Sequence, residues 1–151
     1  MTLQQVTEKL RAGATLYLAG DERMLAQLPR GNWIGGTIPY FMDSAGGTHD
    51  TSRIFVQEQS AAVTSNSIRH YGAEQLADIA RDAPENGFSV VIIPASSEAH
   101  ARFAQDAPDY PGLFMKPMVG WIAGVDLADI GKTQPKVFDG LSGQQFTDRA
   151  V

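Results

Sequence analysis

The sequence predicts an α/β fold in which a mixed β-sheet is flanked by helices, as one domain of packed layers over residues 1–151. Short apolar runs of strand length alternate with segments whose apolar residues recur at helical spacing. The alternation is incomplete, because strand-like segments follow one another in places, and this favours a mixed sheet over a fully parallel one. An α+β arrangement is the alternative. The apolar content of 43% and the charged content of 19% are ordinary for a globular chain.

The first half of the chain opens with a helix signal. Thr2 and Gln5 form a capping box, and the residues that follow are amphipathic. Asp21 is placed to cap a second, short helix. The expected elements are a helix over 1–11, a strand over 15–19, a helix over 21–28, a strand over 32–38, a loop over 43–51 that residues 39–42 lead into, and a strand over 53–58.

The second half contains the strongest strand signal, a continuous apolar run over 88–93 that predicts burial on both faces. The other expected elements are a helix over 73–83, a helix from 96 to about 107, a strand over 117–125, a strand over 136–138 and a last strand from Phe146 onward. Residues 144–151 read like the beginning of a strand. Either the terminal strand is short or the chain was cut from a longer protein.

Charge and composition exclude several classes of partner. The formal net charge is −5, and the 12 lysines and arginines are not clustered, so neither nucleic acid nor an anionic membrane surface is expected as a partner. The chain has no cysteine, which excludes disulfides and thiolate ligands and fits a reducing compartment. No signal peptide and no apolar run of about 20 residues is present. We therefore expect a cytoplasmic protein.

The main candidate for a ligand site is a segment rich in glycine and aromatic residues. It places Trp33 and Tyr40 near Gly35 and Gly36, and aromatic walls beside bare backbone are typical of a small-molecule pocket. Asp43, at the end of this segment, would orient a polar group of the ligand. The alternative is a kinked core strand whose aromatic residues are simply buried.

A second glycine-rich segment is predicted to complete this site. Trp121 stands between Gly120 and Gly124, which would let a ligand or another strand approach the backbone. Close packing of helix against sheet is the alternative explanation for these glycines.

The sequence assigns no catalytic residue and no metal ligand. The serine motif G-x-S-x-G is absent, and no two histidines have the spacing of a helical metal site. If the protein is an enzyme, Asp43, His49 or His70 would act as its general base, because such side chains can exchange protons near neutral pH.

Two stretches resemble the N-terminal FIST sensory domain. One joins the strand over 33–38 to a glycine loop and to 53–56, and the other joins 118–125 to 135–140. Here one residue more than in the family pattern precedes Asp126. The resemblance implies a small-ligand sensor of bacterial signalling and admits haem as a cofactor, without assigning a haem ligand. It covers about two thirds of the chain and one half of a typical family member.

These observations lead us to expect a small-molecule-binding domain, sensory or accessory, without catalysis of its own. One alternative is a metal-independent enzyme with an aspartate or histidine base. The other is a structural module that self-associates. For this module we expect a symmetric homodimer, formed through an exposed edge strand at 144–151 or at 53–58.

Overall fold

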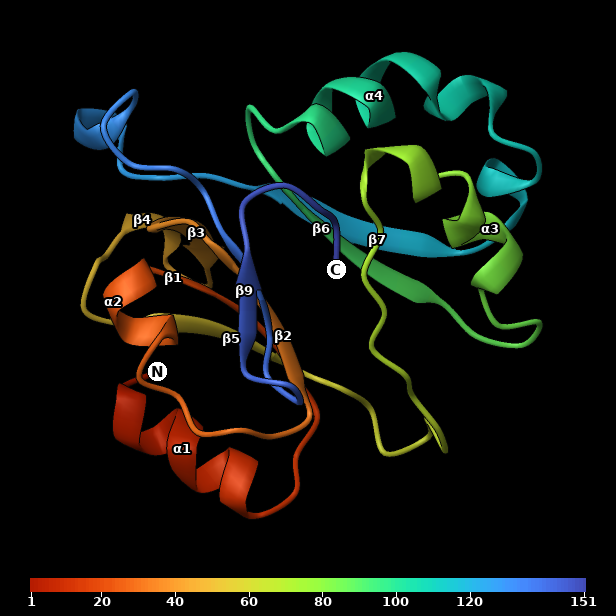
Figure 1. The fold of residues 1–151 in the computed structure, drawn as a ribbon. Helices are drawn as coiled ribbons and strands as arrows, with labels where there is room; N and C mark the ends of the chain where they lie inside the picture. Colours follow the sequence, from red (N-terminus) through yellow and green to blue (C-terminus); the bar gives the residue numbers. More distant parts are fainter.

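The computed structural model describes residues 1–151 and stacks its elements in four layers (Figure 1). The first layer, α1 and α2, covers one face of a five-stranded sheet, which is the second layer. The third layer is a smaller sheet of β6 and β7, which packs on the other face of the five-stranded sheet, and the fourth is α3 and α4. The helices and strands are α1 (Leu3–Arg11), β1 (Leu16–Gly20), α2 (Glu22–Leu25), β2 (Trp33–Thr37), β3 (Tyr40–Asp43), β4 (Gly46–His49), β5 (Ile54–Glu58), α3 (Asp78–Asp82), β6 (Ser89–Pro94), α4 (Glu98–Asp106), β7 (Met118–Ala123), β8 (Val137–Asp139) and β9 (Gln144–Phe146). Four 3₁₀ turns complete the chain: η1 (Ala73–Gln75), η2 (Ala107–Asp109), η3 (Leu113–Met115) and η4 (Leu127–Asp129).

The five-stranded sheet confirms the expected mixed α/β fold. Its strand order is β5-β1-β2-β8-β9. Only β1 and β2 run parallel, and the other neighbours are antiparallel. The parallel pair needs a crossover between its strands, and the segment with α2 provides it. The strand expected at 53–58 lies at one edge of this sheet as β5, and β9 forms the other edge.

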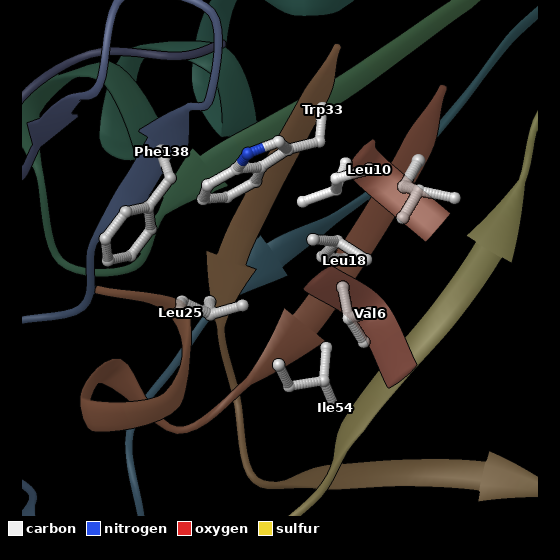
Figure 2. Close-up of a cluster of buried hydrophobic side chains, with 8 residues drawn as sticks. Val6, Leu10, Leu18, Leu25, Trp33, Ile54 and Phe138 are labelled. Carbon is white, nitrogen blue, oxygen red and sulfur yellow. The ribbon is translucent and has the colours of Figure 1, made fainter. Parts of the chain in front are cut away.

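The first core lies between α1, α2 and the five-stranded sheet (Figure 2). The capping box of α1 is confirmed, with the Thr2 hydroxyl accepting the Gln5 N–H at 3.3 Å. This start fixes the helix so that Val6 and Leu10 point into the core. The remaining buried members of the cluster are Leu16, Leu18, Leu25, Trp33, Ile54 and Phe138.

The smaller sheet is buried on both of its faces. Ile93, on one face, packs into a core with residues from α3, α4 and η3. Ile92 and Ala123, on the other face, pack against Ile34 and Val137 of the five-stranded sheet. The apolar run predicted to be buried on both faces is therefore confirmed over the second half of β6, where Ile92 and Ile93 are almost wholly buried.

The C-terminal residues return to the smaller sheet instead of forming the expected strand from Phe146 onward. The strand β9 ends at Phe146, and the chain then crosses between the sheets. Val151 exchanges backbone hydrogen bonds with Ile92 at 2.8 and 3.0 Å, and Ala150 exchanges them with Tyr71. Both terminal residues are buried. The sequence hides this because the pairing partners lie about 60 and 80 residues earlier in the chain.

Three further expected elements differ from the structure. The loop expected over 43–51 and the residues that lead into it form an antiparallel hairpin of β3 and β4, whose glycines weaken the strand signal, and Gly46 has a φ of +118° at its turn. The helix over 73–83 is divided into η1 and α3, and α2 ends at Leu25 instead of Leu28.

The two sheets approach closely at Gly36, near the end of β2. A Cβ atom at this position would lie 2.6 Å from Ile92 Cγ2, 2.9 Å from Trp121 Nε1 and 3.1 Å from Ala123 Cβ. Real Cβ contacts are longer than this, so the missing side chain is what allows β2 to lie against β6 and β7.

We expect the substitution Gly36→Ala to lower the free energy of unfolding by about 1–3 kcal/mol, because the added methyl group must push the sheets apart. Gly124→Ala is the matched control, since its nearest neighbour would be Ile38 Cδ1 at 3.7 Å. Urea denaturation of both variants measures the difference. Equal losses in the two variants would contradict the close approach at Gly36.

Candidate functional site

A cavity lies between the two sheets, at the opposite ends of the strands from Gly36. Its volume is about 460 Å³. The floor is formed by the first residues of β1 and β2, among them Tyr17, Trp33 and Ile34. The facing wall is formed by Ser89, Val90 and Val91 at the start of β6. The sheets therefore touch at one end and leave a space at the other.

An extended segment, residues 59–71, covers this cavity, and we call it the roof segment. Residues 62–69 of the roof segment line the cavity, and no helix or strand forms within 59–70. At its start, the Tyr17 hydroxyl donates a hydrogen bond to Gln59 Oε1 at 2.7 Å. In its middle, Asn32 Nδ2 donates to Asn66 Oδ1 at 3.4 Å. These polar side chains connect its start and middle to the sheet, together with a backbone hydrogen bond from Gln59 N–H to Thr15 O and the packing of Ile68 on the core between the sheets.

The end of the roof segment is fixed more firmly. His70 Nε2 lies 3.0 Å from Asp139 Oδ2, and the imidazole packs on the Phe146 ring with centroids 4.6 Å apart. Arg69 forms an ion pair of 2.9 Å with Asp82 of α3. The roof segment is thus tied to both sides of the cavity, since Asp139 belongs to the five-stranded sheet.

Asp139 is the best satisfied carboxylate at this anchor. Its Oδ1 accepts the backbone N–H groups of Leu141 and Ser142, and its Oδ2 accepts the Ser142 hydroxyl at 2.6 Å. Burial pushes the pKa of Asp139 upward, but these hydrogen bonds and the nearby His70 outweigh burial and hold its pKa below the ordinary value. The ionised carboxylate is therefore the form that the folded chain selects.

The cavity lining combines apolar surface with neutral hydrogen-bonding groups. About half of the lining residues are apolar, and the polar ones are mostly amides and hydroxyls. The only charged side chains among them are Arg69 and Asp82, which are paired with each other. Burial raises the pKa of the Tyr17 hydroxyl, so it stays protonated and remains a hydrogen-bond donor.

Among the residues predicted to bind a ligand, only Trp33 lines this cavity. Its side chain is 4% exposed, its Nε1 donates to Pro29 O at 3.0 Å, and its ring packs on Phe138. Gly35 and Gly36 lie where a side chain would crowd Leu18 and Ile92. The alternative of a core strand with buried aromatic residues therefore describes most of this segment.

Tyr40 and Asp43 lie on the β3–β4 hairpin, outside the cavity lining. Tyr40 stacks on His49 with ring centroids 4.6 Å apart, and its hydroxyl contacts Asp126 Oδ1 at 3.4 Å. Asp43 accepts the Ala45 N–H at 2.8 Å and thereby closes the hairpin turn. The hairpin explains both residues without a ligand.

Trp121 lies against Gly36, also outside the cavity lining. Its Nε1 is buried and has no hydrogen-bond partner in the protein. Gly120 has a packing reason of its own, because a Cβ atom there would collide with the backbone of Val91.

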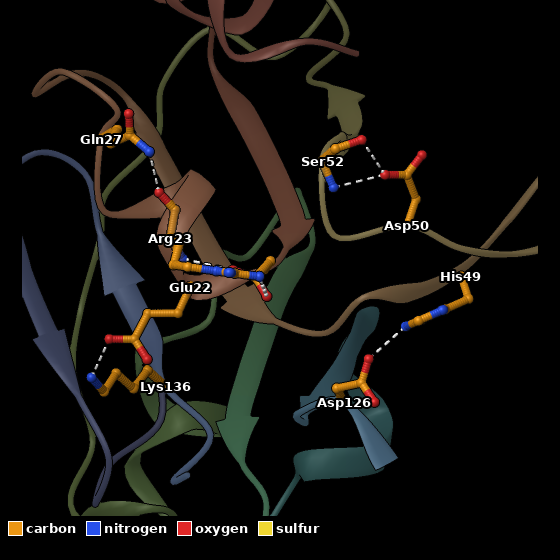
Figure 3. A network of polar contacts seen from close by, with 9 residues as sticks. Glu22, Arg23, Gln27, His49, Asp50, Ser52, Asp126 and Lys136 are labelled. Atoms are coloured by element: carbon orange, nitrogen blue, oxygen red, sulfur yellow. Dashed lines mark hydrogen bonds and ion pairs between the residues drawn. The ribbon is translucent and has the colours of Figure 1, made fainter. Parts of the chain in front are cut away.

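The residues considered as general bases are held apart from the cavity. His49 Nε2 lies 2.6 Å from Asp126 Oδ2 on the surface (Figure 3), and His70 is bonded to Asp139. The backbone N–H of Ala128 and the contact with His49 lower the pKa of Asp126. Neither histidine nor Asp43 lines the cavity.

Sequence reasoning missed the roof segment and its partners on the floor. The residues that make the cavity polar are Tyr17, Asn32, Gln59, Asn66 and Arg69. The available signal was the length of the connection after β5, because long stretches without secondary structure are uncommon inside a compact domain and are often functional.

The fold defines an α/β domain of two stacked sheets with a cavity between them. The chain matches the model of the family of unknown function DUF6976 over residues 1–151, and it belongs to that family. Searches of curated proteins and of solved structures find no match. None of the helices has the length and apolar character that crossing a bilayer requires.

We expect Asp139→Asn to lower the free energy of unfolding at pH 7 by about 1–3 kcal/mol, because the hydrogen-bond donors around the carboxylate lose their charged acceptor. The exposed Asp148→Asn is the control and should cost less than about 0.5 kcal/mol.

The pH dependence of this difference has a definite sign. The pKa of Asp139 is lowered by folding, so its stabilisation is complete above the ordinary aspartate pKa of about 3.9 and is lost as the pH falls toward the lower, folded value. Denaturation at pH 7, 5, 4 and 3 should therefore show wild type and variant converging in acid. A difference that grows in acid would contradict this role.

Proposed function

We propose that this protein is a small-molecule-binding domain, sensory or accessory, whose ligand occupies the cavity under the roof segment. The observation that supports this most is the cavity itself. Its volume of about 460 Å³ falls within the range of small-molecule sites, and its lining mixes apolar walls with a few polar groups. The resemblance to FIST sensory domains agrees with this class and stays a prediction.

The lining favours an uncharged ligand. Arg69 and Asp82 neutralise each other at 2.9 Å, so an ionic ligand would have to separate them or remain without a counter-charge. Asn32, Asn66 and Tyr17 offer hydrogen bonds in both directions. A neutral molecule with an apolar body and hydroxyl, carbonyl or amide groups matches this surface.

Haem does not fit the residues of the cavity. No histidine, methionine or cysteine lines it. The two tyrosines in the lining, Tyr17 and Tyr71, direct their hydroxyls to Gln59 and Asp82. The usual axial ligands are therefore either absent or engaged.

The enzyme alternative has less support. A general base must lie within hydrogen-bond reach of its substrate, and Asp43, His49 and His70 lie outside the cavity lining. The proposal of self-association is independent of the cavity and is developed in the next subsection.

We expect a library of neutral metabolites to contain a ligand that changes the fluorescence of Trp33. The chain has two tryptophans, and Trp121→Phe leaves Trp33 as the only one. This variant loses no hydrogen bond, because Trp121 Nε1 has no partner. Titration of the folded variant should give a saturable signal. The absence of any signal or thermal shift across the library would count against the proposal.

We expect Tyr17→Phe to weaken the binding of such a ligand by about 2- to 10-fold, because the hydroxyl that holds Gln59 of the roof segment, and whose oxygen can accept a hydrogen bond from the ligand, is lost. Tyr110→Phe is the matched control, since Tyr110 packs on Phe103 away from the cavity. The dissociation constants of both variants would be measured by calorimetry. Equal weakening in both, or none in Tyr17→Phe, would place the ligand elsewhere.

A further inference from the structure

The strand β7 has a backbone edge without a partner. Ser89 N–H donates to Pro117 O at 3.0 Å, and Ala95 N–H donates to Ala123 O at 2.9 Å. Backbone groups of alternate residues point the same way along a strand, so the odd-numbered residues of β7 face β6. The N–H and C=O groups of Met118, Gly120 and Ile122 therefore face away from it.

These outward groups find no partner within the chain. The only strand that pairs with β7 is β6, and no turn or loop bonds to Met118, Gly120 or Ile122. Gly124 N–H, the next outward group, donates to Thr37 O at 2.5 Å and closes the edge at that end. The open stretch thus spans Met118 to Ile122.

The surface around this edge is apolar. Val119 is 60% exposed and Ile122 is 38% exposed, which is unusual for large apolar side chains on a well-formed strand. The neighbouring residues before and after β7 add to it. Six of the ten large exposed hydrophobic side chains fall between residues 114 and 130: Phe114, Met115, Val119, Ile122, Leu127 and Ile130.

The other edge strands have fewer backbone groups available for pairing with a second chain. The second edge of β6 is covered by Val151, and β5 is paired at Ile54 with Met1. β9 is an edge strand of only three residues. β6 and β7, with six residues each, are the longest edge strands, and of the two only β6 has a backbone partner on its outer side, Val151 at Ile92. This separates β7 from the edge strands at 53–58 and 144–151 that the sequence suggested for a dimer.

The charges flanking β7 suit an antiparallel copy of the same strand. Lys116 precedes the strand, whereas Asp126 and Asp129 follow it. Two copies running in opposite directions would place the lysine of each near the aspartates of the other. A parallel arrangement would place like charges together, which is unfavourable.

We propose that two copies of this chain pair through β7, antiparallel and about a two-fold axis near Gly120, so that their smaller sheets join into one. Pairing about this axis sets Met118 opposite Ile122 of the other copy and satisfies the outward backbone groups of both. Gly120 carries no side chain to crowd the axis. On the face that carries Ile122, each Ile122 gains Met118 of the other copy as a cross-strand neighbour.

Sedimentation velocity over a concentration series tests the dimer. The mass of the wild type should rise from the monomer value of 16.3 kDa to twice that value. Ile122→Lys should raise the dimer dissociation constant at least about tenfold, because it places a charged side chain against Met118 of the other copy. Leu141→Lys is the matched control, equally apolar and 60% exposed in the β8–β9 turn, and should leave the constant unchanged.

Amide hydrogen exchange tests the edge itself and reports even if a variant folds poorly. In the wild type, the Gly120 and Ile122 amides should be protected at high concentration and lose protection on dilution. A mass that stays at 16.3 kDa at high micromolar concentration would overturn the proposal. So would a dimer in which these two amides exchange equally fast at both concentrations. Neither measurement involves a cavity ligand, so the binding proposal stands or falls separately.

Discussion

The close contact between the two sheets at Gly36 is the constraint on which the rest of the structure depends. Without a side chain there, β2 lies against Ile92 and Ala123, and the sheets meet face to face. The contact is made near the end of β2 and in the second half of β6. At the beginning of these strands no such contact forms, and the space becomes the cavity. The contact at Gly36 and the cavity at the other end of the strands therefore both result from the way the two sheets pack.

This arrangement also explains why the cavity needs a separate cover. The helices are used on the outer faces, α1 and α2 over the larger sheet and α3 and α4 over the smaller one. The open side between the sheets is left to the roof segment, which is held by Gln59 at its start and by His70 at its end. Its middle residues are mostly exposed, so few buried apolar contacts support them, and this fits the proposal that a ligand enters there.

Local patterns predicted much of the fold. Apolar runs located β1, β2, β6 and β7, and the capping box located the start of α1. Hairpin β3–β4 was missed because its glycines carry no strand preference, and the return of Val151 to Ile92 was missed because nothing local encodes such a distant pairing. For the site, the sequence correctly indicated a close approach at Gly36, but the approaching group is a second sheet instead of a ligand. The cavity is assembled from well-separated segments whose polar residues show no period, so no single pattern reveals it.

The central claim is that a small molecule binds between the two sheets, and chemical-shift mapping of the ¹⁵N-labelled protein tests it most directly. Once a ligand is found, the account predicts that perturbed amides cluster at the roof segment and the wall opposite, at Asn66, Ser67, Ser89 and Val90. The amides of Tyr40 and Asp43 should stay unchanged, since the hairpin lies outside the cavity lining. Perturbations confined to the hairpin and Trp121 would contradict the account, and would place the ligand at the glycine–aromatic segments that the sequence predicted.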